Sequence, residues 1–147
     1  MMRQLLPVSL QEPMNQNREP LPAKQTLLFI LVPMLVTFVV LRLYLHLVHV
    51  QHLYPGGYLV HHLFLGILIL LPATFTLAFA PPQRPLRVLA LVAVGIGSAM
   101  ILDEFVYLVA TKATDKDYVS RISLFGAIVS ISLATILLLV LYLLNRE

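Results

Sequence analysis

The amino-acid sequence predicts an all-α polytopic membrane protein, a four-helix bundle whose successive spans run up, down, up and down. Composition is the first observation: 59% of the 147 residues are hydrophobic and only 12% are charged, against about 25% charged in an average soluble domain. Too few polar side chains remain to cover a globular surface in water, so lipid is the expected solvent. The second observation is that four apolar segments reach the roughly 20 residues that a helix needs to cross the hydrocarbon core.

The breaks between these segments are well marked. Turn residues dominate "YPGG" and "PPQRP", and "TKATDKD" is polar, as expected for connections between helices. Because the connections are short, consecutive spans are expected to be antiparallel neighbours. The predicted spans are 25–50, 58–80, 86–110 and 120–144.

The segment that precedes the first span differs from the rest of the chain. Residues 1–24 contain four prolines and no continuous apolar run, whereas a secretory signal needs an apolar region of about 7–15 residues. We therefore expect residues 1–24 to form a flexible cytosolic N-terminal tail and residues 25–147 to form a single transmembrane domain.

The orientation of the bundle follows from the distribution of lysine and arginine, which favours cytosolic segments. With the amino terminus inside, the inner segments carry Arg3, Arg18, Lys24, Arg84, Arg87 and Arg146. The outer segments carry Lys112, Lys116 and Arg121. Six basic residues against three predict that both termini are cytosolic, as in a multi-pass protein of a bacterial inner membrane. The connection between the first two spans would then face the periplasm.

Two classes of function are disfavoured by composition. The chain has no cysteine, which removes disulfides, thiolate metal sites and cysteine nucleophiles. Its net charge of +3 comes from scattered residues, whereas nucleic-acid binding needs a concentrated basic face. Membrane lipids are the expected partners.

Histidines gather near the outer end of the first two spans. All five lie between His46 and His62. Arg42, His46 and His49 are spaced i, i+4, i+7, which places them on one helical face. In the second span His62 shares a stripe with the helix-packing residue Gly66. His61 points about 100° away from His62, so we expect it to be a bystander.

The third span carries an acidic pair beside small residues. Gly95, Ala99 and Asp103 form one stripe, and Glu104 lies on the adjoining stripe with Gly97. Small residues allow helix backbones to approach closely in lipid. The acidic pair is therefore expected on the packed side, in the outer half of the bundle and below the histidines. Ionisable groups at such depth usually mark a functional site or pair with each other.

The fourth span presents a smooth face made of serine and alanine. This face comprises Ser123, Ala127, Ser130 and Ala134. It is suited either to packing inside the bundle or to a homo-oligomer interface through the fourth helix, and the sequence leaves both open.

A divalent metal site is the preferred hypothesis for these polar residues. The candidate ligands are His46, His49, His62, Asp103 and Glu104. Mixed histidine and carboxylate sets suit zinc, iron or manganese. An open coordination position could support hydrolysis or redox chemistry on a lipid-soluble substrate. Arg42 would then hold the second carboxylate or an anionic headgroup.

Three alternatives stay open beside the metal. Arg42 could form a structural ion pair with Asp103 or Glu104 in a non-enzymatic subunit. Histidines beside buried carboxylates could relay protons or form part of an ion pathway. Haem held by two axial histidines is the weakest alternative, because the acidic pair would repel its propionates.

Two elements of the sequence, "HHLFLG" and "GIGSAMILDEF", are similar to elements of known proteins. Together they resemble a group of small bacterial four-span integral membrane proteins in which HH-x-x-x-G precedes a glycine-rich L-D-E-F helix. The group has no established activity, so the resemblance implies a site and no reaction. Its marked positions are His61, His62, Gly66, Gly95, Gly97, Asp103, Glu104 and Phe105.

Overall fold

The computed structural model describes residues 21–47, 61–81, 83–112 and 115–146. Within these ranges the chain is all-helical. Four helices are long and apolar enough to cross a membrane, and a fifth, α4, is a single turn. The helices are α1 (Ala23–Leu47), α2 (His62–Phe79), α3 (Arg84–Ala110), α4 (Asp115–Tyr118) and α5 (Arg121–Leu144).

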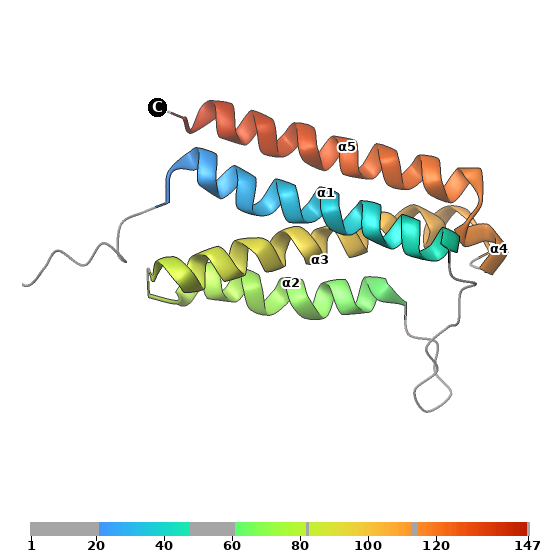
Figure 1. Cartoon of the computed structure of the whole chain (residues 1–147), viewed down its shortest axis with the longest axis horizontal. Coiled ribbons are helices and arrows are strands. Elements are labelled where there is room, and N and C mark those ends of the chain that lie inside the picture. Colours follow the sequence, from blue (N-terminus) through green and yellow to red (C-terminus); the bar gives the residue numbers. More distant parts are fainter. Residues whose placement is uncertain (1–20, 48–60, 82, 113–114, 147) are drawn as a thin grey trace, which may run out of the picture.

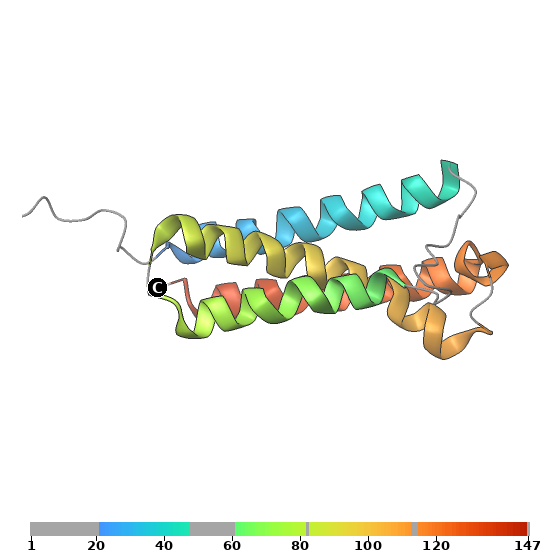
Figure 2. The same ribbon diagram turned by 90° about the horizontal axis from the view of Figure 1, so that it is seen from below.

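The four long helices lie side by side along one axis (Figure 1). Each runs in the direction opposite to the long helix before it, so the start of α1 and the end of α5 lie at one end of the molecule. The helix α3 is central, because it packs against α1, α2 and α5. The last turns of α1 lean away from α2 and α3 (Figure 2).

The predicted spans agree with the four long helices to within a few residues. The predicted residues 48–50 and 58–60, like most of the predicted tail, lie outside the described residues. The helix α3 begins at Arg84, two residues before its predicted start, because Pro85 occupies the first turn, where its missing N–H costs no hydrogen bond. The short helix α4 was not predicted.

Close backbone contacts fix how α3 meets its two neighbours. A Cβ atom added to Gly97 would lie 2.7 Å from the carbonyl oxygen of Gly66, and one added to Gly66 would lie 2.8 Å from that of Gly97. On the opposite side of α3, a Cβ on Gly95 would collide with the backbone of Ile30 in α1. Such approaches are open only to small residues. The stripes that hold the acidic pair therefore face α1 and α2.

The apolar core is small, as expected when lipid rather than water surrounds the bundle. Met34, Ala99 and Ile131 are buried together, one from each of α1, α3 and α5. Large apolar side chains instead cover the outer surface; Phe79 is 84% exposed and Phe125 is 70% exposed. In lipid this exposure carries no hydrophobic penalty, and packing between helices supplies the association energy.

The serine- and alanine-rich face of the fourth span, now α5, packs inside the bundle. Ser123 and Ala127 are fully buried, and Ala134 packs against the apolar core. This face is therefore used for packing within the bundle. A homo-oligomer through α5 would have to use the opposite, exposed face of that helix.

Candidate functional site

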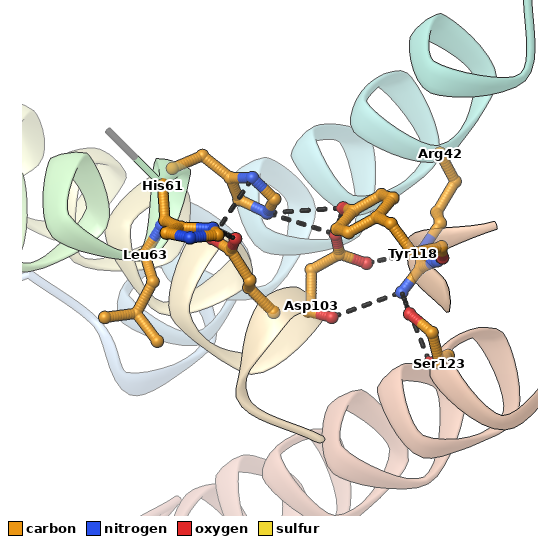
Figure 3. Close-up of polar contacts among 8 residues, drawn as sticks. Arg42, His61, Leu63, Asp103, Tyr118 and Ser123 are labelled. Carbon is orange, nitrogen blue, oxygen red and sulfur yellow. Dashed lines mark hydrogen bonds and ion pairs between the residues drawn. The ribbon is translucent and has the colours of Figure 1, made fainter. Parts of the chain in front are cut away.

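A cluster of ionisable and hydrogen-bonding side chains occupies the end of the bundle where α1 ends and α2 begins (Figure 3). We call it the polar cluster. Each long helix contributes to it, either directly or through the residue that caps it. Its members are Arg42, His61, His62, Asp103, Glu104, Tyr118 and Ser123.

Arg42 and Asp103 form the ion pair at the centre of the polar cluster. Arg42 Nε lies 2.5 Å from Asp103 Oδ1. The Asp103 side chain is fully buried, and Arg42 is only 9% exposed. A buried carboxylate is costly unless it is paired and hydrogen-bonded. Here the guanidinium supplies both the counter-charge and a donor.

The guanidinium of Arg42 also contacts the backbone of three other helices. Its Nη2 donates to the carbonyl oxygen of Asp103 at 3.1 Å and to the carbonyl and hydroxyl oxygens of Ser123, each at 3.3 Å. Its Nη1 donates to the carbonyl oxygen of Tyr118 at 3.2 Å. Of these carbonyls, that of Tyr118 lies at the end of α4, where the C=O groups have no helical partner. One side chain of α1 therefore holds α3, α4 and α5 in register.

Tyr118 covers the cluster from the short helix α4. Its hydroxyl donates to Asp103 Oδ2, and its ring lies 4.9 Å from Arg42 Cζ, a cation–π distance. Tyr118 and Tyr107 pack edge to face with centroids 5.0 Å apart. Burial, and then the nearby Asp103 carboxylate, raises the pKa of Tyr118 well above its ordinary value. Tyr118 is therefore a neutral hydrogen-bond donor here.

Glu104 faces α2, on the other side of α3 from α1. Its Oε1 contacts His61 Nδ1, and its Oε2 accepts the backbone N–H of Leu63 at 2.7 Å. Leu63 lies in the first turn of α2, where the N–H groups have no helical partner. The carboxylate thus caps α2 and gains from the positive end of its dipole.

His62 lies between the two carboxylates. Its Nε2 is 3.2 Å from Asp103 Oδ2, and its Nδ1 is 3.2 Å from Glu104 Oε2. Its Nε2 also lies 3.3 Å from the Tyr118 hydroxyl. Both nitrogens of one imidazole therefore lie within ion-pair distance of acidic side chains of α3. The His61 and His62 side chains are 16% and 18% exposed, whereas those of Asp103 and Glu104 are buried.

The structure brings together only some of the predicted site residues. Arg42, His62, Asp103 and Glu104 meet as described above. His46 is exposed on α1: the face it shares with Arg42 leaves the bundle where α1 leans away (Figure 2). His49 lies outside the described residues.

Two side chains belong to the polar cluster against expectation. The prediction that His61 is a bystander is wrong, because His61 contacts Glu104. His61 precedes the first turn of α2 with an extended backbone, at φ −75° and ψ 143°, so helical periodicity does not set its direction. Tyr118 was not predicted at all, because it follows the polar connection after the third span. Tyr107 is buried beside Tyr118.

A metal centre is not evident in the described part of the chain. No group of three or more histidine and acidic side chains there is arranged to hold a metal ion. Both oxygens of Asp103 already accept hydrogen bonds, from Arg42 and from Tyr118.

Comparison of the chain with protein-family models, characterised proteins and solved structures finds no match. The resemblance to small bacterial membrane proteins thus gains no support from these comparisons.

Proposed function

We propose that the protein is a non-enzymatic, multi-pass inner-membrane protein that handles protons, and that His62 carries its exchangeable proton. This is the proton-relay alternative of the sequence analysis. One observation supports it above the others: the two ring nitrogens of His62 each lie 3.2 Å from a different carboxylate.

The hydrogen-bonding capacity of imidazole favours the protonated form of His62 between two carboxylates. A neutral imidazole has one N–H donor and one acceptor nitrogen, whereas an imidazolium donates from both. An ionised carboxylate only accepts. A neutral His62 could donate to only one of the two carboxylates. With an additional proton, the ring could donate to both.

The proton belongs on His62 rather than on a carboxyl group. Asp103 accepts from Arg42 and Tyr118, and Glu104 accepts from the Leu63 N–H. Donors that already point at carboxylate oxygens stabilise the ionised form. His61 can supply its Nδ1–H to Glu104 as a neutral imidazole.

Charge balance leads to the same assignment. Two carboxylates and one guanidinium leave the polar cluster with one uncompensated negative charge when both histidines are neutral. An imidazolium at His62 makes the cluster neutral, which burial favours strongly. Loss of the proton restores the buried charge, so release must accompany a rearrangement or the arrival of another cation.

Exposure indicates the side from which protons exchange. The histidines are partly exposed and the carboxylates are not. Toward the bundle centre, the close contact between Gly66 and Gly97 seals α2 against α3. We therefore propose a site that opens to one membrane face, with onward passage requiring α2 to move relative to α3.

The orientation of the protein belongs to this proposal. We infer an up-down-up-down topology with both termini cytosolic, from the six basic residues predicted inside against three outside. The polar cluster then lies near the periplasmic face, where the external proton concentration acts on it.

Zinc, iron or manganese binding, and catalysis on a lipid-soluble substrate, stay predictions from sequence. A divalent ion could occupy the place of the His62 proton only if the imidazole turned a lone pair toward it. The ion would also approach the Arg42 guanidinium, whose charge opposes it. A proton on His62 neutralises the polar cluster without any change in the contacts described above.

Proton movement in reconstituted vesicles tests the proposal. The parent protein should dissipate an imposed pH gradient several-fold faster than protein-free vesicles, and Asp103→Asn should abolish the increase. Arg121→Gln, an exposed charge at the same end, should behave like the parent. Equal rates for the parent and Asp103→Asn would contradict a proton pathway. Elemental analysis of the same preparation, made without chelators or a histidine tag, should find less than a stoichiometric amount of metal.

A further inference from the structure

A groove lies between α1 and α5, at the end of the bundle opposite to the polar cluster. Its volume is about 330 Å³. Figure 1 shows the first turns of α1 and the last turns of α5 at this end. The groove is lined by Ala23, Thr26, Leu27 and Ile30 of α1 and by Leu138, Leu141, Tyr142 and Asn145 at the end of α5.

The lining residues give the groove an elongated shape. In each helix they follow the spacing i, i+3, i+4, i+7, which places them on one face over two turns. At about 1.5 Å per residue, the two faces run alongside each other for roughly 10 Å. Most lining side chains are aliphatic, and the polar Asn145 lies at the outer end of the groove. This is the form of a site for a single hydrocarbon chain.

Positive charge surrounds the outer end of the groove. Lys24 follows the lining residue Ala23, Arg146 follows the lining residue Asn145, and both side chains are exposed. Arg84, at the start of α3, donates to the Gln25 side chain at 3.3 Å, which brings a third cation to this end. Basic residues near a membrane surface attract anionic lipid headgroups.

We propose that this groove binds one acyl chain of an anionic glycerophospholipid and that Lys24 and Arg146 contact its headgroup phosphate. The apolar lining accounts for the chain, and the basic rim accounts for the charge of the headgroup. The lipid holds the weakly packed ends of α1 and α5 together. The site is independent of the proton-handling proposal, because it shares no residue with the polar cluster.

Native mass spectrometry of the delipidated full chain in detergent tests the charge requirement. Phosphatidylglycerol and phosphatidylcholine with identical acyl chains serve as the probes. The parent should bind one phosphatidylglycerol more tightly than phosphatidylcholine. Each rim cation contributes about fivefold, so the double variant Lys24→Gln/Arg146→Gln should lower the preference about 25-fold. Arg121→Gln, at the opposite end of α5, should keep it.

Absence of a preference in the parent would overturn the proposal, and so would a preference that survives in the double variant. A second variant tests the apolar part. Thr26→Trp fills the groove and should weaken both lipids, whereas Val140→Trp, which projects from the exposed face of α5, should weaken neither. Equal binding by these two variants would place the lipid elsewhere.

A second copy of the chain is the competing occupant of the groove. Because the chain has no cysteine, Thr26→Cys introduces a single reactive thiol. The lipid proposal predicts that oxidation of membranes that contain this variant leaves it monomeric. Efficient disulfide-linked dimers would show that a protein surface covers the groove and would overturn the proposal.

Discussion

Arg42 Nε and Asp103 Oδ1 lie 2.5 Å apart inside the bundle, and the same guanidinium donates to carbonyl oxygens of Asp103, Tyr118 and Ser123. A single side chain thus neutralises a buried charge and joins α1 to three other helices. This pair is the centre of the polar cluster, and Tyr118 and His62 also contact its Asp103 carboxylate.

Replacing Arg42 by alanine should therefore destabilise the fold severely. The substitution leaves Asp103 buried without its counter-charge, a loss that typically costs about 3–5 kcal/mol. Arg42→Lys should recover only part of this, because an ammonium lacks the planar fork of donors. Thermal unfolding in detergent micelles measures both. Arg121→Ala, an exposed control, should change stability by less than about 0.5 kcal/mol; similar effects at Arg42 and Arg121 would show that the ion pair is energetically unimportant.

The contact between His61 and Glu104 should appear as a coupling free energy. A double-mutant cycle with His61→Ala and Glu104→Ala isolates the pair from their other contacts. A hydrogen bond to a charged group is worth about 1.5–3 kcal/mol, so we expect coupling in that range. Additive effects of the two substitutions on the free energy of unfolding would mean that the contact does not contribute to stability.

Close packing of α2 on α3 should make Gly97 intolerant of a side chain. In Gly97→Ala, the new Cβ would meet the Gly66 carbonyl oxygen at 2.7 Å, so the helices must separate. Overpacking of this kind costs about 1–3 kcal/mol. Leu68→Ala, on the lipid-facing side of α2, should cost little, because lipid replaces the lost contacts. Chemical denaturation of both variants decides the comparison, and a tolerated alanine at Gly97 would refute the close approach.

Tyr118 should make the protein sensitive to alkaline pH. Burial raises its pKa in the folded state above the value of about 10 that an unfolded tyrosine has. Below pH 10 both states keep the proton and the phenol contributes its full stabilisation. Above pH 10 only the unfolded state loses the proton, so stability falls as pH rises.

Melting temperatures between pH 8 and 11 check this sign. Tyr118→Phe should lower stability by about 1–3 kcal/mol at pH 8, because Asp103 loses a donor, and should flatten the decline above pH 10. The same slope in both proteins would assign the alkaline sensitivity to other groups.

The fold was largely predictable because helices that cross a lipid bilayer need long apolar runs, which are easily seen in the sequence. Four long apolar runs separated by turn residues predict the number of long helices, and the observed ends differ from the predicted ones by a few residues, as at Pro85 and Ser120. The direction of Asp103 was also predictable. It shares a stripe with Gly95 and Ala99, and small residues mark the packed side of a membrane helix.

Helical periodicity does not predict the other parts of the polar cluster. His61 and Tyr118 lie just outside the long helices, where the direction of a side chain depends on how the connections fold. His46 follows Arg42 by one turn, yet it is exposed because α1 leaves the bundle there (Figure 2). Periodicity identifies the face of a helix but does not reveal where its neighbour ends.

The protonation state of His62 tests the central claim most directly. Nitrogen NMR of the protein labelled with ¹⁵N-histidine, with His62→Gln to assign the signals, distinguishes an imidazolium from either neutral tautomer. We expect both ring nitrogens of His62 to be protonated at pH 7, and we expect Asp103→Asn to convert the ring to a neutral form by removing one negative charge. A neutral imidazole at His62 in the parent protein would contradict the proposal that the polar cluster holds an exchangeable proton.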